Sequence, residues 1–275
     1  MITDLTREFD NDGATLRWDR WGADGGTPFL LCHGFSGSSH DFAEHIEALA
    51  VARPVVSIDH RGHGRSQKVG TTEAYAIDQL TADLIAFVDS EIGGPVHLLG
   101  HSMGGSIALR FTLARPDLVK SLILMDTSGW SFVPPDSPVA EMMNSFITAF
   151  DPARGLPDLT AMAGPEEALI NAAMTPEWLA VKQERAAAFD PYAFKALGAE
   201  LFAGGTQWIR ERLGEIACPV SVIVGEHDHP FVDQGAELAA EANGGQLTVV
   251  AGAYHSPQLT HAAEWAAAVE AHLTR

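Results

Sequence analysis

The chain has 275 residues, of which 36 are acidic and 17 basic, so its formal net charge is −19 with neutral histidines. Nucleic acids and anionic membrane surfaces are bound through basic patches, so this charge balance argues against both as partners. With 46% hydrophobic residues, a chain of this length can bury one large core, which favours a single α/β domain with an insertion.

Neither a targeting segment nor a membrane segment is expected. The first eight residues lack a basic segment followed by an apolar stretch, and no run approaches the ~20 apolar residues that span a membrane. We therefore expect a cytoplasmic protein that acts on a small molecule, with no prediction of its oligomeric state. Cys32 and Cys218 each lie in or beside an apolar run and are expected to be core residues rather than a disulfide or metal pair. No metal-ligand spacing appears, so no metal is expected.

The first part of the chain predicts strands followed by turns or helices. Residues 14–21 alternate enough to form an early antiparallel edge strand. Residues 29–32 form a short apolar strand that ends in the loop His33-Gly34-Phe35-Ser36-Gly37, and residues 55–59 form a buried strand. Residues 72–92 have helical spacing, with one apolar face made of Tyr75, Leu80, Leu84, Phe87 and Val88.

The sequence Gly100-His101-Ser102-Met103-Gly104 lies between an apolar run, residues 95–99, and a helical one, residues 105–111. A serine between a strand and a helix, with glycines two residues away on each side, is the arrangement of a nucleophile elbow. The amides at the start of the following helix point toward the same place, where they stabilise a developing negative charge. Ser102 is therefore the candidate nucleophile. The backbone amides of Phe35 and Met103 are the candidate oxyanion hole.

The strand pattern breaks after a further central strand, residues 121–125. From residue 127 to residue 205 there is no strand signal, only helical stretches separated by prolines, which predicts a helical cap inserted into a core made of residues 1–126 and 206–275. Loops carried on a rigid scaffold usually make the substrate contacts. The cap is rich in Trp, Phe and Met, which favours an uncharged, largely apolar substrate. The candidate pocket residues are Trp130, Phe146 and Trp178.

The last part of the chain supplies an acid and a base. Residues 219–225 read as a buried strand followed by Glu226-His227-Asp228, and residues 247–250 read as the next strand, followed after a short turn by His255. The candidate triad is thus Ser102, Asp228 and His255, in that order. Asp126 also ends a strand and is the alternative acid.

These motifs, together with the turn Asp59-His60-Arg61-Gly62-His63-Gly64-Arg65-Ser66, resemble the α/β-hydrolase superfamily over nearly the whole chain. The resemblance implies a mostly parallel central sheet with helices on both faces, an inserted helical cap and an acyl-enzyme mechanism that needs no cofactor. In that mechanism His255 takes the proton of Ser102, and Asp228 orients the imidazole.

The resemblance leaves the substrate open, because a fold does not fix a substrate. A neutral carboxylic ester is the first expectation, and a lactone or enol-lactone is the second. Carbon–carbon bond hydrolases share the Ser-Met-Gly-Gly elbow but commonly have Asn where this chain has His101, so they rank lower. A hydrolase-like ligand-binding protein is the alternative from another class.

Overall fold

The computed structural model describes residues 5–134, 136–157, 164–202 and 207–275. Its centre is an eight-stranded sheet of order β1-β2-β4-β3-β5-β6-β7-β8, in which β1, β2 and β4 pair antiparallel and the remaining neighbours pair parallel. The strands are β1 (Arg7–Asn11), β2 (Ala14–Trp21), β3 (Phe29–Cys32), β4 (Val55–Asp59), β5 (Val96–His101), β6 (Val119–Met125), β7 (Val220–Gly225) and β8 (Gln246–Val250). The predicted mostly parallel α/β sheet is confirmed.

The prediction that residues 14–21 form an edge strand is wrong in one respect. These residues form β2, but β2 pairs with β1 on one side and with β4 on the other, so β1 is the edge. The sequence did not predict β1, because in Arg-Glu-Phe-Asp-Asn only Phe9 is buried and the other residues are polar. Such a strand depends on its pairing with β2 rather than on an apolar face.

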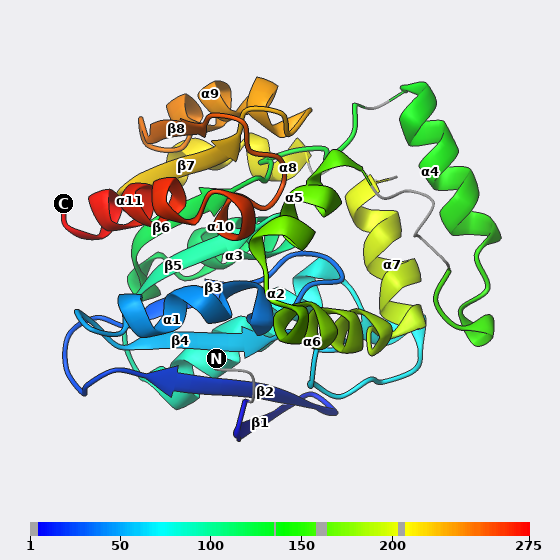
Figure 1. Ribbon diagram of the computed structural model, residues 1–275, viewed down its shortest axis with the longest axis horizontal. Helices are drawn as coiled ribbons and strands as arrows, with labels where there is room; N and C mark the ends of the chain where they lie inside the picture. Colours follow the sequence, from blue (N-terminus) through cyan, green and yellow to red (C-terminus); the bar gives the residue numbers. More distant parts are fainter. Residues whose placement is uncertain (1–4, 135, 158–163, 203–206) are drawn as a thin grey trace.

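Helices cover both faces of the sheet (Figure 1). They are α1 (Ala43–Leu49), α2 (Ile77–Phe87), α3 (Met103–Ala114), α4 (Pro138–Ala149), α5 (Pro165–Ala173), α6 (Pro176–Ala187), α7 (Pro191–Phe202), α8 (Gln207–Arg210), α9 (Phe231–Glu241), α10 (Pro257–Thr260) and α11 (Ala262–Leu273). Shorter helical turns are η1 (Ser39–Phe42), η2 (Thr72–Ala74), η3 (Val88–Ile92), η4 (Pro116–Leu118), η5 (Pro152–Arg154) and η7 (Leu213–Glu215). The helix predicted over residues 72–92 is therefore three consecutive elements, η2, α2 and η3, and its predicted apolar face is buried.

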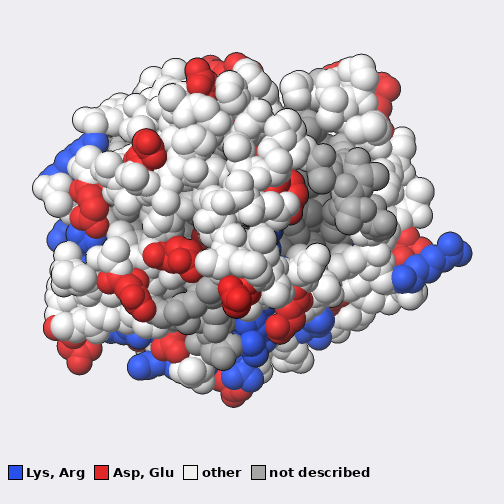
Figure 2. All heavy atoms as spheres, in the orientation of Figure 1, with Lys and Arg blue, Asp and Glu red and all other residues white. Residues whose placement is uncertain are grey.

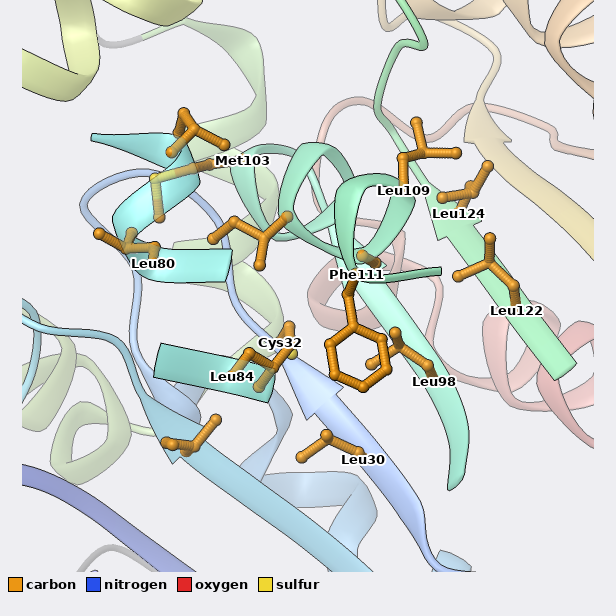
Figure 3. Packing of buried hydrophobic residues seen from close by; sticks show 14 of the residues in the cluster. Leu30, Cys32, Leu80, Leu84, Leu98, Met103, Leu109, Phe111, Leu122 and Leu124 are labelled. Atoms are coloured by element: carbon orange, nitrogen blue, oxygen red, sulfur yellow. The ribbon is translucent and has the colours of Figure 1, made fainter. Parts of the chain in front are cut away.

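The strand β3 shows how the sheet separates two parts of the core. Successive side chains of a strand point to opposite faces. Leu30 and Cys32 pack in the cluster that contains α2, α3 and α9, whereas Phe29 and Leu31 pack in the cluster that contains α1 and α11. Figure 3 shows the first cluster, in which side chains of α2 and α3 meet those of β3, β5 and β6. This packing fixes α3 against the sheet and so fixes the start of that helix.

The helices α4 to α8 are inserted between β6 and β7. In the described part of residues 127–205 there is no strand, as the sequence predicted. Figure 1 shows α4, α6 and α7 beyond the edge at which the parallel strands end. Residues 158–163 and 203–206 of the predicted cap lie outside the described residues.

The two cysteines are free. Cys32 is buried as expected, whereas Cys218 is only partly buried at the margin of the core. Within the described ranges, every helix is too short or too polar to cross a membrane.

Candidate active site

Ser102 lies at the junction of β5 and α3 in a strained backbone conformation. Its φ is 53° and its ψ is −117°, outside the helical and extended regions, and such strain is concentrated at functional sites. The amide of Ser102 donates to the carbonyl of Met125 at 2.9 Å, which ties the turn to β6. A Cβ at Gly104 would lie 2.4 Å from the carbonyl oxygen of Cys32, and one at Gly100 would lie 2.3 Å from that of Gly104. Both positions therefore require glycine.

His255 and Asp228 are joined by a hydrogen bond of 2.8 Å between Nδ1 of the ring and Oδ2 of the carboxylate. Asp228 follows β7 and His255 follows β8, so the parallel strands bring the two residues to the same edge of the sheet. Burial lowers the pKa of His255, but the charge and hydrogen bond of Asp228 and the charge of Glu166 raise it, and the pKa ends above its usual value. The imidazolium is thus favoured beside these two carboxylates.

Asp126 lies behind this pair and is completely buried. One of its carboxyl oxygens accepts the amide of Gly225 at 2.8 Å, and oxygens of Asp126 and Asp228 lie within 4.8 Å of a ring nitrogen of His255 and of each other. Burial raises the pKa of Asp126 well above its usual range, and the neighbouring Asp228 raises it further. The protonated form of Asp126 is therefore favoured beside Asp228. A metal ion at this cluster would compete for the atoms that already join His255 to Asp228, so we interpret the cluster as an acid–base group.

The loop after β3 is held by His33. Nε2 of His33 accepts the amide of His60 at 3.0 Å, so Nδ1 carries the proton and donates to the carbonyl of Gly34 at 2.8 Å. Phe35 follows Gly34 directly. Met103 is the first residue of α3, so its amide has no acceptor within the helix. These two amides remain the predicted oxyanion hole.

Ser102 and His255 line one cavity of about 220 Å³. The apolar part of its wall is formed by Phe35, Ala186 and Leu259. Two cationic residues of α6, Lys182 and Arg185, also line it. Its other lining residues are Gly34, Ser36, Gly37, Ser38, Asp41, His101 and Ser256.

The three aromatic residues predicted to contact substrate are absent from the described lining of this cavity. Trp178 is 1% exposed and stacks on His40, with ring centroids 4.6 Å apart. Trp130 lies under the guanidinium of Arg210 at 4.3 Å, and Phe146 packs against other aromatic rings of the insertion. The structure therefore does not place Trp130, Phe146 or Trp178 in the described lining of the cavity: each ring packs against other side chains, and Phe146 is also 38% exposed.

Two residues near His255 were not among the predicted site residues. Glu166, on α5, accepts the amide of Ser256. It follows Gly164 and Pro165 and is indistinguishable in sequence from an ordinary acid in the first turn of a helix. His101 donates from Nε2 to the carbonyl of His255 at 2.8 Å, and burial, with the nearby His255, lowers its pKa to about 3. Only its place beside Ser102 could have drawn attention to it.

A sequence model of the α/β hydrolase fold matches residues 27–262. The chain belongs to the α/β-hydrolase fold family.

The chain is 30% identical to the dihydrolipoyllysine-residue acetyltransferase component of the acetoin cleaving system of Cupriavidus necator, over 96% of this chain and 68% of that protein. The Pseudomonas putida protein of the same name is 38% identical over 117 residues, which make up 42% of this chain and 31% of that protein. The chain thus spans less than a third of the Pseudomonas relative. Among solved structures, Est816, described as an N-acyl homoserine lactone degrading enzyme, has a TM-score of 0.72 and 25% identity, over 96% of this chain and 99% of that chain.

Proposed function

We propose that this chain is a serine hydrolase that cleaves a carboxylic ester through an acyl-enzyme. Ser102 attacks the ester carbonyl after its proton passes to His255, and Asp228 holds the imidazole in the tautomer that accepts this proton. The oxyanion is bound by the amides of Phe35 and Met103. A water molecule, activated by His255, then releases the acyl group. The observation that carries the proposal is the 2.8 Å bond between His255 and Asp228 at a cavity shared with Ser102.

In this proposal residues 127–205 act as a cap, since α6 contributes Lys182, Arg185 and Ala186 to the cavity above Ser102. The apolar side chains of Phe35, Ala186 and Leu259 support a substrate with a small apolar acyl part. The charge of the substrate stays open, because Lys182 pairs with Glu167 at 3.4 Å, Arg185 pairs with Glu184 at 3.6 Å, and Asp41 lines the same cavity. Cytoplasmic residence stays a prediction from the sequence.

A lactone is the second candidate substrate. The likeness to Est816 favours it, because a lactone is a cyclic ester and needs the same nucleophile, base and oxyanion donors. The name of the two curated relatives favours testing acyl transfer as well, since an acyl-enzyme can pass its acyl group to an acceptor other than water.

Labelling with a fluorophosphonate, followed by intact mass measurement, tests the nucleophile. We expect one stoichiometric adduct, which is lost in Ser102→Ala and retained in the control Ser36→Gly. Ser36 lines the same cavity, and its φ of 58° suits glycine.

Ser102→Ala and His255→Ala should each lower kcat for the best ester by at least roughly 10³-fold, because the two residues act as one chemical unit. Near-normal turnover by folded Ser102→Ala protein would overturn the mechanism.

A substrate panel identifies the class. It contains p-nitrophenyl esters of increasing acyl length, matched neutral and anionic esters, lactones, a vinylogous diketone, and each ester with an added thiol acceptor. Each methylene buried against an apolar wall contributes about 0.8 kcal/mol, so kcat/KM should rise several-fold per carbon until the cavity is full. Stoichiometric labelling without turnover of any member would favour the ligand-binding alternative.

A further inference from the structure

The helix α5 of the insertion is docked on the segment that carries His255. Its Ile170 is buried in a cluster with Trp178 of α6 and Leu259 of α10. The carbonyl of Trp178 accepts a hydrogen bond from Nε2 of His40 at 3.0 Å, which ties the same cluster to the core. Figure 1 shows α5 directly beside α10. The start of α5 therefore has a fixed position relative to His255, two residues before α10.

Glu166 lies in the first turn of α5 and reaches this segment. Its Oε1 accepts the amide of Ser256 at 2.5 Å, and Ser256 directly follows His255 and precedes the first residue of α10. A carboxylate that accepts a backbone amide makes a charge-assisted hydrogen bond, which is stronger than one between neutral groups. The bond thus restrains the backbone next to the candidate base.

The charge of Glu166 also acts on the imidazole. Burial raises the pKa of Glu166, whereas the charge of His255 and the amide of Ser256 lower it, and the pKa stays above its usual value. In the other direction, the charge of Glu166 acts with Asp228 to raise the pKa of His255. Each group therefore favours the ionised form of the other.

The remaining groups around His255 come from several elements. His101, at the end of β5, has its ring centroid 4.9 Å from that of His255. Its ring is neutral because burial lowers its pKa to about 3. Phe231, at the start of α9, is uncharged, and its ring centroid lies 5.4 Å from that of His255. The titratable or charged groups that face His255 or line its cavity are Asp228, Asp126, Glu166, His101, Asp41, Lys182 and Arg185.

We propose that Glu166 is a positioning residue contributed by the insertion, which holds the His255 segment through the amide of Ser256 and places a second carboxylate beside the imidazole. The proposal rests on the proposed role of His255 as the base. When His255 takes the proton of Ser102, the imidazolium is stabilised by Glu166 as well as by Asp228. Because Glu166 reaches the amide of Ser256 only while α5 is docked, the His255 segment is fully restrained only when the insertion is in place.

The test separates the charge of Glu166 from its hydrogen bond. Glu166→Gln keeps an oxygen that accepts the Ser256 amide but removes the charge, and Glu166→Ala removes both. The pKa of His255 is measured directly by NMR titration of labelled histidines, with His255→Gln to assign the signal. Glu141→Gln, on the exposed side of α4 in the same insertion, is the control.

We expect Glu166→Gln to lower the pKa of His255 by about 0.5 to 1 unit and to move the acidic limb of kcat/KM to lower pH by the same amount. Glu166→Ala should give the same shift and, in addition, lower kcat by about tenfold, because the segment loses its restraint. Glu141→Gln should change neither quantity. An unchanged His255 pKa in Glu166→Gln would overturn the proposal even if the enzyme is active. The pKa shift without ester or lactone turnover by the wild type would uphold the proposal and refute the proposed function.

Discussion

At the scale of single residues, Asp228 and Asp126 are two neighbouring carboxyl groups with different hydrogen-bond partners. Asp228 accepts from the imidazole of His255, whereas Asp126 accepts the amide of Gly225, and its burial raises its pKa and favours its protonated form. We expect Asp228→Asn to lower kcat by roughly 10²- to 10⁴-fold, because an amide favours the wrong imidazole tautomer. Asp126→Asn keeps an oxygen that accepts the Gly225 amide and leaves the bond between His255 and Asp228 in place, so it should cost less than about tenfold. Steady-state kinetics on both variants checks this, and the reverse ranking would assign the acid role to Asp126.

The residues of the candidate triad could be predicted because each follows a strand, and strand ends are visible in sequence. Parallel pairing then brings Ser102, Asp228 and His255 to one edge of the sheet. Glu166 could not be predicted in this way. Its position depends on how α5 packs on α10, a contact between segments about 90 residues apart that no local pattern encodes. For the same reason, the sequence could not distinguish Trp178, which packs on His40, from a residue that lines the cavity.

At the scale of elements, the turn between β5 and α3 depends on the close approach of α3 to the end of β3. We expect Gly104→Ala to destabilise the protein by about 1–3 kcal/mol, because the new Cβ would meet the carbonyl oxygen of Cys32 at 2.4 Å and the backbone must shift. Gly94→Ala is the matched control, since a Cβ at Gly94 has no described atom within 4 Å. Urea unfolding measures both. Equal stability of the two variants would show that the turn has room for a side chain.

Elements with a clear apolar signal were predicted well, and those shaped by their neighbours were not. The limits of β3 and β4 agree with the sequence because both strands are buried throughout. All four residues of β3 are apolar, and Val55, Val56 and Ile58 give β4 its apolar signal although Ser57 and Asp59 are polar. The edge strand β1 buries only Phe9 and was missed, whereas β8, although exposed over most of its length, was predicted to within one residue from its run Leu247-Thr248-Val249-Val250. In β1, pairing to a neighbouring strand, rather than a hydrophobic pattern, determines the structure.

At the scale of the whole molecule, the surface and the interior respond differently to pH. Acidic side chains are spread over the face shown in Figure 2, in keeping with the net charge of −19. The interior instead contains histidines that are uncharged. Burial, as the largest cause, lowers the pKa of His60 and His63 well below the usual value, that of His101 to about 3 and that of His272 to about 4. Within the described residues, each of these rings has a buried nitrogen without a partner.

These four histidines predict that the protein loses stability in mild acid. The unfolded chain binds protons at histidine below about pH 6.5, whereas the folded protein does not until its depressed pKa values are reached, so the free energy of unfolding falls as the pH drops. Each histidine contributes up to about 1.4 kcal/mol per pH unit in that range. The opposite direction is taken by the groups whose pKa is raised, namely Asp41, Asp126, Glu166, Glu200 and His255. Burial also lowers the pKa of His40, His45 and His97, so among the described residues the histidines with a lowered pKa outnumber these groups. Urea unfolding from about pH 7.5 to about pH 5 measures the slope. His272→Gln should reduce it by up to about one proton. A free energy of unfolding that is constant or rises toward pH 5 would contradict the uncharged state of these buried rings.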